Sequence, residues 1–520
     1  MRFGILVAAL AVCFWGGQAR AAWIEASSDH FVIYANDSDK DITRFSQQLE
    51  RYHAGMAFVL GQKVAKPSPS NRVTVYVVKN EREVRQLHGG DNKFVGGFYV
   101  PSAGGSLAIV PSVQSGSGST VTWSMIVLLH EYAHHFLIST SSAAMPRWLS
   151  EGAAEFFASA KFEADGGLWL GRPASHRAGE LFYAQDVKAA DLLDPTEYDK
   201  RKHTTYDAFY GKSWLLYHYL TFGGDRKGQM TRYVELLAKG RGQRDAALEA
   251  FGDFDVLEKN LDSYLKKRRM TALTLTPEVL SIGPVSLRTL SAGEAEIMPV
   301  RIRSRRGVSS EEAATLLVEA RQIAAKYPQD PAVLAALAEC EFDAGHDREA
   351  IAAADSAIAH DPSQVNAYIQ KGYALFREAE DNRGDDKERA AAYKAARAPF
   401  IALNRIENDH PLPLVYFYRS FVEQGQTPSD LAISGLIRAV ELAPFDLGLR
   451  MNLGTALLRL GRSPEARIVL GPVANNPHVN SGSRFARSLI ERMEKDPSWK
   501  GEGMGQEAPE EPEAEGDADK

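Results

Sequence analysis

The chain has 520 residues, of which 44% are hydrophobic and 24% are charged, and its net charge is −7. This composition is typical of globular protein and excludes a collagen-like, coiled-coil-only or wholly disordered chain. The negative charge excludes a bulk basic field, so we expect no nucleic-acid partner. The length predicts about three domains. Two cysteines, Cys13 and Cys340, are too few for a disulfide framework or a cysteine-rich zinc site.

Residues 1–21 have the features of a secretory signal peptide. Arg2 gives a positive start, residues 5–15 form an apolar run too short to span a bilayer, and Ala19-Arg20-Ala21 matches the A-x-A cleavage pattern. We expect a mature chain that begins near Ala22, with an uncleaved N-terminal anchor as the alternative. No later stretch approaches the roughly 20 apolar residues of a transmembrane helix. We therefore expect a periplasmic or secreted protein without a transmembrane segment in the mature chain.

The next region, residues 22–270, predicts an α+β domain. Strand-like stretches at residues 30–35 and 72–78 flank a helical spacing of apolar residues at 40–60. Apolar runs at 96–100 and 107–110, joined by a glycine-rich turn, predict a hairpin. The signals then become mostly helical, and we expect helices at residues 121–138, 146–160, 205–221, 228–239 and 253–268.

The segment that follows, residues 271–308, contains short apolar stretches and three prolines without a helical period. We expect it to be a small β-rich connector. At the other end of the chain, residues 496–520 are rich in Glu, Gly, Pro and Ala, and we expect a disordered acidic tail there.

Residues 309–495 carry an internal repeat. Small residues lie 34 positions apart, at Ala338 and Gly372 and again at Ser420 and Gly454. Small residues let paired helices pack closely, and proline ends the second helix. Further members of the pattern are Ala350, Ala357, Ala432, Ala439, Ala466, Pro362, Pro444 and Pro477. The pattern resembles the tetratricopeptide repeat, with an unrelated array of α-hairpins as the alternative. The resemblance implies an all-α array that binds a protein partner on its concave face.

Residues 128–134 contain the motif H-E-x-x-H. Positions i and i+4 of a helix share one face, so His130 and His134 can bind one metal ion. Neutral imidazole suits Zn²⁺, and Glu131 can reach a metal-bound water. A surface helix with two solvated histidines is the alternative. The apolar run at residues 126–129 favours a buried helix, where two unpaired histidines would be costly.

A pair of glutamates follows the motif, with sixteen residues between His134 and Glu151. Pro146 can begin a helix on which Glu151 points at the metal as a third ligand. Glu155, one turn later on the same face, would accept an N–H from a ligating histidine and fix its tautomer. The alternative is a solvated acidic pair on an amphipathic helix.

Residues 148–155 read Trp-Leu-Ser-Glu-Gly-Ala-Ala-Glu, which is similar to the W-L-N-E-G-F-A-E segment of the leukotriene-hydrolase-type aminopeptidases. Together with H-E-x-x-H, this segment resembles the gluzincins, a group of zinc metallopeptidases. The resemblance implies a zincin-like peptidase domain over residues 22–270 and one Zn²⁺ per chain. It assigns His130, His134 and Glu151 as the zinc ligands and Glu131 as the general base. The G-x-M-E-N motif of the aminopeptidases is not found ahead of H-E-x-x-H, so aminopeptidase specificity is not supported.

Residues 209–213 are similar to the Y-E-K-G segment of the same family. The resemblance implies that Tyr210 donates a hydrogen bond to the oxyanion, and Tyr206, one turn earlier, is a second candidate. Core aromatic packing is the alternative for both tyrosines. In the family an edge strand holds extended substrate by β-augmentation. The candidate is the hairpin within residues 94–110, unless it is an ordinary surface hairpin.

These features together predict an exported zinc metallopeptidase with a repeat array. Glu131 would take a proton as water attacks the peptide carbonyl and then pass it to the leaving amine. The expected partners are a peptide or protein substrate and a protein on the array. Two alternatives stay open: a non-catalytic repeat scaffold with a degenerate peptidase domain, and zinc hydrolysis of a non-peptide substrate such as an epoxide or a cell-wall amide.

Overall fold

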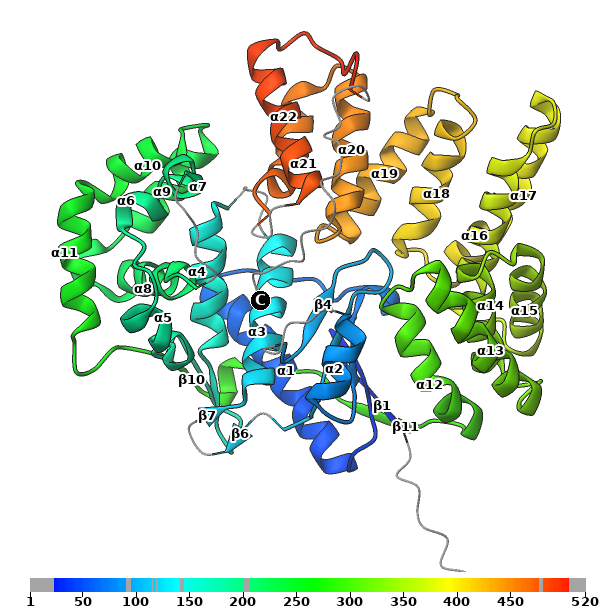
Figure 1. The fold of residues 1–520 in the computed structure, drawn as a ribbon, viewed down its shortest axis with the longest axis horizontal. Helices are drawn as coiled ribbons and strands as arrows, with labels where there is room; N and C mark the ends of the chain where they lie inside the picture. Colours follow the sequence, from blue (N-terminus) through cyan, green and yellow to red (C-terminus); the bar gives the residue numbers. More distant parts are fainter. Residues whose placement is uncertain are drawn as a thin grey trace, which may run out of the picture.

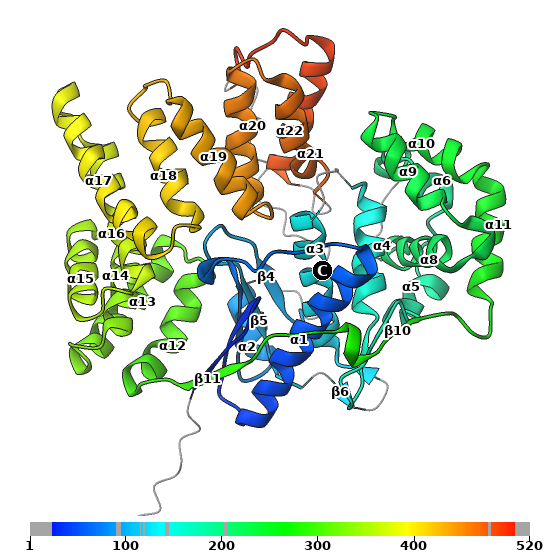
Figure 2. The ribbon, with the colours of Figure 1, turned by 180° about the vertical axis from the view of Figure 1, so that it is seen from behind.

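The computed structural model describes residues 23–89, 95–114, 116–117, 120–140, 145–200, 206–476 and 480–504. The predicted signal peptide and Pro477 therefore lie outside the described residues. A mixed α/β N-terminal region is followed by an all-helical array that curves around one side of it (Figures 1 and 2). Among the described residues, no helix is both long enough and apolar enough to cross a bilayer.

A six-stranded mixed sheet forms the centre of the N-terminal region, in the order β11-β1-β2-β3-β5-β4. β2, β3 and β5 run parallel, and β4 lies at the edge, antiparallel to β5. Because side chains alternate along a strand, Phe31 and Ile33 enter one core while Val32 and Tyr34 enter another. The strands are β1 (Ile24–Ser27), β2 (Phe31–Ala35), β3 (Val73–Val77), β4 (Phe98–Val100), β5 (Leu107–Val110) and β11 (Ser286–Thr289).

Helices cover both faces of this sheet. α1 (Asp39–Leu60) and α3 (Trp123–Thr140) pack on the face that carries Phe31, whereas α2 (Glu81–His88) and α12 (Ala292–Arg305) pack on the opposite face. α3 is thus held between the sheet and the helices that follow it in the chain. A short hairpin precedes α3, formed by β6 (Gly116–Ser117) and β7 (Thr120–Val121).

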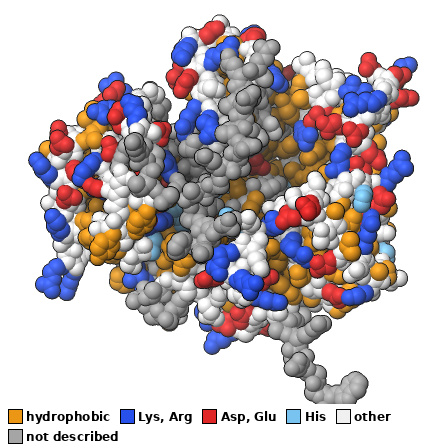
Figure 3. Space-filling view, viewed as in Figure 1, with side chains coloured by type: hydrophobic (Ala, Val, Ile, Leu, Met, Phe, Trp, Pro, Cys, Tyr) orange, Lys and Arg blue, Asp and Glu red, His pale blue; other side chains and the backbone are white. Residues whose placement is uncertain are grey.

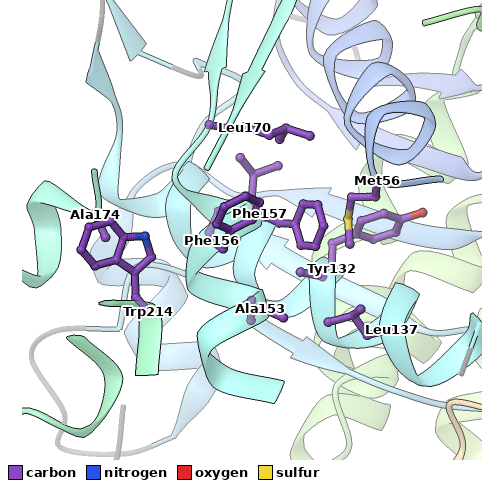
Figure 4. Packing of buried hydrophobic residues seen from close by; sticks show 14 of the residues in the cluster. Met56, Tyr132, Leu137, Ala153, Phe156, Phe157, Leu170, Ala174 and Trp214 are labelled. Atoms are coloured by element: carbon purple, nitrogen blue, oxygen red, sulfur yellow. The ribbon is translucent and has the colours of Figure 1, made fainter. Parts of the chain in front are cut away.

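The helices α4–α11 form a helical lobe on the side of α3 away from β4 (Figure 1). α4 (Arg147–Ala158) is buried along nearly its whole length between α3 and α8 (Phe209–Phe222). Phe156 and Phe157 of α4 pack among buried residues of α1, α3 and β9, as Figure 4 shows. The other elements are α5 (Ala178–Tyr183), α6 (Ala189–Leu192), α7 (Pro195–Asp199), α9 (Gln229–Ala238), α10 (Gln243–Phe251), α11 (Phe254–Leu265), β8 (Lys161–Phe162), β9 (Leu168–Leu170) and β10 (Leu273–Leu275).

The segment expected to be a β-rich connector, residues 271–308, is only partly β. β10 belongs to a three-stranded sheet with β9 and β8, and β11 belongs to the six-stranded sheet, but the second half of the segment is the helix α12. A capping box starts this helix, since the Ser291 and Glu294 side chains each accept a hydrogen bond from the other residue's backbone N–H. Pro299 lies inside α12, so the proline that suggested an interruption is accommodated within the helix.

The array consists of helices that pair in sequence, α14 with α15, α16 with α17, α18 with α19 and α20 with α21. The small residues of the 34-residue pattern lie where a paired helix comes close. A Cβ on Gly372 would come within 2.4 Å of the Phe400 ring, and one on Gly454 within 2.5 Å of Leu470. The helices are α13 (Ser310–Lys326), α14 (Pro331–Asp343), α15 (Asp347–His360), α16 (Val365–Asp381), α17 (Asp386–Ile406), α18 (Pro411–Val422), α19 (Asp430–Leu442), α20 (Leu447–Arg459), α21 (Ser463–Ala474) and α22 (Ser481–Lys495).

The expected disordered tail, residues 496–520, was wrong in its first part. Trp499 and Met504 are buried in the same core cluster as α20 and α22. The Arg492 guanidinium lies over the Trp499 ring, 4.3 Å from its centroid. These two apolar side chains gain enough burial to order residues 496–504, whereas residues 505–520 lie outside the described residues.

The close approach of α4 to α8 predicts a stability effect at Gly152. A Cβ on Gly152 would lie 2.5 Å from the backbone oxygen of Ser213, which cannot rotate away. We expect Gly152→Ala to destabilise the protein by about 1–3 kcal/mol, measured by denaturant unfolding. Gly435→Ala, also within a helix but with its nearest neighbour 3.8 Å away, is the control and should be neutral or slightly stabilising. Equal stability of the two variants would contradict the packing described here.

Candidate metal centre

α3 brings the two histidines of H-E-x-x-H together inside the protein. His130 and His134 are both buried, and their Nε2 atoms lie 3.1 Å apart. The helix is fixed from behind by α1, because the Tyr52 hydroxyl donates a hydrogen bond to the Leu129 carbonyl at 2.9 Å. The alternative of a solvated surface helix is therefore wrong, and both imidazoles face the same interior point.

α4 places a buried carboxylate at that point. Glu151 Oε2 lies 3.3 Å from Nε2 of His130 and 3.3 Å from Nε2 of His134. The side chain is fully buried, and neither carboxylate oxygen has a hydrogen-bond partner among the described residues. One ligand atom from each of the three residues lies within 4.8 Å of the other two. Two imidazole nitrogens and one carboxylate oxygen are a donor set that catalytic zinc takes, so these residues fit a zinc ion.

The charges of the cluster also favour a cation. Burial lowers the pKa of His130, but the nearby carboxylates of Glu151 and Glu155 outweigh it and raise the pKa to about 10. Burial raises the pKa of Glu151, but the charge of His134 and the contact with His130 hold it well below its ordinary value. Both carboxylates therefore stay ionised at neutral pH and favour positive charge between them.

Ser150 supports the second histidine, a role that the sequence did not indicate. Its Oγ lies 3.1 Å from His134 Nδ1, the ring nitrogen that faces away from the cluster. A partner on Nδ1 orients the ring and leaves Nε2 toward the metal position. Neighbouring residues of α4 thus contact the cluster from two sides, because Glu151 belongs to it and Ser150 contacts His134 from behind.

Glu155 lies beside the first histidine, one turn after Glu151. Its Oε1 lies 3.1 Å from His130 Nδ1, a close contact whose geometry is not that of the predicted hydrogen bond. The same carboxylate contacts His176 Nε2 at 2.6 Å and accepts hydrogen bonds from Arg177 at 2.6 and 3.0 Å. Burial raises the pKa of Glu155, but the Arg177 charge and the two histidine contacts hold it well below its ordinary value.

Arg177 links this carboxylate to the start of α8. It donates to Glu180 Oε1 at 2.6 Å, and Glu180 Oε2 accepts the backbone N–H of Gly211 at 3.0 Å. Its guanidinium also lies over the Tyr210 ring, 4.7 Å from the centroid. Sequence reasoning missed His176, Arg177 and Glu180, because they form no motif and meet Glu155 only through the tertiary fold.

Tyr210 is the tyrosine that lies beside the cluster. It is half-buried, and its ring centroid is 6.4 Å from that of His130. Tyr206 is 52% exposed, and its hydroxyl lies against Gly179 of α5. Of the two candidates, the geometry favours Tyr210. Glu131 is half-buried on α3, and no hydrogen bond or ion pair engages its carboxylate within the part of the chain described.

The hairpin predicted within residues 94–110 is present and is formed by β4 and β5. Phe94, the first residue of the predicted range, lies outside the described residues. β4 is the edge strand on the array side of α3, and the Tyr99 hydroxyl lies 2.6 Å from His135 Nδ1. His135 therefore makes a structural contact and is not one of the three residues that converge on the candidate site. The edge strand β4 and the H-E-x-x-H helix α3 are therefore in direct side-chain contact.

Comparisons with known proteins cover parts of the chain. Residues 124–240 match a family described as "Protein of unknown function (DUF1570)", which spans most of α3 and much of the helical lobe. No curated protein matches the chain. The family description says nothing of a metal or of catalysis.

Two solved structures are similar to about two fifths of the chain. One is the crystal structure of a thermophilic TPR protein of Thermus thermophilus, with 18% identity, a TM-score of 0.33, and coverage of 38% of this chain and 100% of that chain. The other is "MamA RS-1 ArsTM double mutant", with 16% identity, a TM-score of 0.27, and coverage of 40% and 100%. At these TM-scores neither likeness carries an argument, and the repeat character of the array comes from its own helix pairs.

The buried contacts of Arg177 predict a large stability effect. Arg177→Met removes the guanidinium that donates twice to the fully buried Glu155 carboxylate. Breaking a buried ion pair on one side costs about 3–5 kcal/mol, measured by denaturant unfolding at neutral pH. Arg467→Met, which removes an exposed ion pair on the array, is the matched control and should cost under about 1 kcal/mol. A similar small loss in both variants would show that Glu155 does not depend on Arg177.

Proposed function

We propose that the protein is a zinc metallopeptidase that hydrolyses peptide bonds. The observation that carries the proposal is the convergence of His130, His134 and Glu151 on one buried point, with a carboxylate that has no hydrogen-bond partner among the described residues. A bare buried carboxylate is costly, and a bound cation would offset that cost. The resemblance of the two motifs to the gluzincins supports the same reaction.

His130, His134 and Glu151 would hold the zinc ion, with Ser150 and Glu155 orienting the two imidazoles from behind. When bound, zinc supplies Lewis acidity that lowers the pKa of a water to about 7 and polarises a carbonyl. These five residues come from α3 and α4 alone. The site is therefore built on two packed helices rather than on loops, which favours a fixed donor geometry.

The protein's own groups would carry the proton transfer. Glu131 takes the proton of the attacking water and passes it to the leaving amine, because its carboxylate follows His130 directly on α3 and is free of protein partners within the described residues. Tyr210 would donate a hydrogen bond to the developing oxyanion. Arg177 would hold the tyrosine ring in place through their stacked contact.

The array supports a second, non-catalytic role in binding protein. Its inner side is partly taken by the N-terminal region, which lies within its curve (Figures 1 and 2). Figure 3 shows hydrophobic side chains gathered on the face of the array that is turned toward the viewer. We propose that a protein partner or substrate binds there, and that the leader-like residues 1–21 direct the protein to the periplasm or the exterior.

Metal analysis tests the donor set. We expect the purified chain to hold about one zinc per chain at neutral pH. Loss of an outer-shell partner typically weakens metal binding by about 10–100-fold. Because Glu151 is the proposed direct ligand, Glu151→Gln should weaken zinc binding by at least that factor. The measurement is competition with a chromophoric chelator. Glu349→Gln, an exposed glutamate on α15, is the control and should bind zinc as the wild type does. A wild-type chain without zinc would favour the scaffold alternative.

A peptide-library digest tests the reaction. We expect cleavage that a chelator abolishes, and a loss of about 10²–10⁴-fold in Glu131→Gln while zinc is retained, because the general base is removed. Tyr210→Phe should lose about 10²–10³-fold, and Tyr206→Phe should remain active as its control. A zinc-loaded chain that cleaves no peptide would reject the peptidase. Zinc-dependent cleavage of an amide or epoxide instead would identify the non-peptide alternative.

A further inference from the structure

The loop between α19 and α20 reaches from the array into the N-terminal region. Asp446 in this loop uses both carboxylate oxygens: Oδ1 accepts the Leu449 N–H at 2.8 Å and caps α20, and Oδ2 accepts the Ala103 N–H at 2.9 Å. Ala103 lies in the turn between β4 and β5. One carboxylate therefore joins the start of an array helix to the tip of the edge hairpin.

The neighbouring Phe445 reaches the H-E-x-x-H helix. Its ring centroid lies 4.4 Å from that of His135, the residue that follows His134. The same imidazole contacts the Tyr99 hydroxyl of β4 at 2.6 Å. The array, α3 and the edge strand thus meet at His135. Arg450 of α20, also buried, lies 3.5 Å from the Ile138 carbonyl near the end of α3.

Other contacts fix the same hairpin tip. The Asn71 side chain accepts the Gly104 N–H at 3.0 Å and donates to the Leu442 carbonyl of the array at 3.1 Å. Gly104 has φ 79°, and a Cβ there would lie 2.6 Å from the buried His410 ring. Beside the tip, Glu407 of the array accepts two hydrogen bonds from Ser70, the neighbour of Asn71, at 3.0 and 2.8 Å. The array is therefore packed against the hairpin tip and the segment next to it, and it is not a loosely tethered module.

We propose that the repeat array is a positioning element of the metal site, and that Phe445 and Asp446 set the edge strand β4 relative to α3. This inference rests on the proposed peptidase function. β4 has only three residues and, within the described part of the chain, pairs with β5 alone, so its own hydrogen bonds fix its orientation weakly. The two histidines of the metal site lie on α3, whereas an extended peptide would pair with β4. The position of the peptide relative to the metal would therefore depend on the position of β4 relative to α3.

The expected consequence is selective. Neither Phe445 nor Asp446 is among the metal-binding or proton-transfer residues, so zinc binding should not change. A displaced β4 would weaken the pairing of an extended peptide in the ground state and in the transition state alike, and such a loss of uniform binding raises KM without lowering kcat. We therefore expect Phe445→Leu and Asp446→Asn to raise KM for extended peptides by about 10-fold or more, with little change in kcat.

The test uses the full chain and two matched controls. Asp446→Asn retains an oxygen that can cap α20 but replaces the acceptor that faces Ala103. Asp385→Asn makes the same change at the cap of α17 and should leave KM unchanged. Among the described residues, Asp385 accepts only N–H groups at the start of its own helix. Phe445→Tyr keeps the ring against His135 and should restore the wild-type KM that Phe445→Leu loses.

A second measurement does not depend on activity. Hydrogen–deuterium exchange of the metal-free chain should be faster over residues 98–110 in Phe445→Leu and Asp446→Asn than in the wild type, and unchanged in Asp385→Asn. Wild-type exchange and wild-type KM in both junction variants would overturn the positioning role while Glu131→Gln still abolishes cleavage. If the zinc-loaded wild type cleaves no peptide, the peptidase proposal fails, and faster exchange in the junction variants would then support a purely structural junction and overturn its catalytic consequence.

Discussion

The buried carboxylate of Glu151 is the group on which the candidate site depends. It sits 3.3 Å from an imidazole nitrogen of each histidine and accepts no hydrogen bond among the described residues. Such a group is stable in the protein interior only beside positive charge, whether a protonated imidazole or a metal cation. The Arg177 guanidinium serves other carboxylates, since it is engaged by Glu155 and Glu180. A cation at the centre satisfies the three ligands together.

The residues that surround this centre come from α4, from the turn that contains Arg177, and from the start of α8. Ser150 and Glu155 flank Glu151 on α4, so one short helix provides the carboxylate of the candidate site and a contact with the outer nitrogen of each histidine. Arg177, Glu180 and the start of α8 extend the network to Tyr210. A displacement of α4 would therefore disturb the Glu151 carboxylate and the contacts of both imidazoles at once.

Local periodicity accounts for what the sequence predicted. The i,i+4 spacing of His130 and His134 and of Glu151 and Glu155 needs only a helix, and the five helices expected between residues 121 and 268 correspond to α3, α4, α8, α9 and α11. The contacts of His176, Arg177 and His135 could not be predicted, because each partner lies on a different element brought near by tertiary packing. The helix α12 was not predicted because Pro299 suggested an interruption, although Ser291 and Glu294 form a capping box at its start. The order of residues 496–504 was not predicted because the segment is mostly polar and only two of its apolar side chains are buried in the core.

The burial of Trp499 and Met504 has a consequence for how the molecule behaves toward copies of itself. In a stack of helix pairs each unit covers the apolar side of the one before, and the last unit needs a cover of its own. Here the cover is the non-helical segment 496–504, which follows α22, rather than an additional polar helix. A chain cut after Lys495 would leave the terminal pair uncovered, and such an end invites head-to-tail association into oligomers.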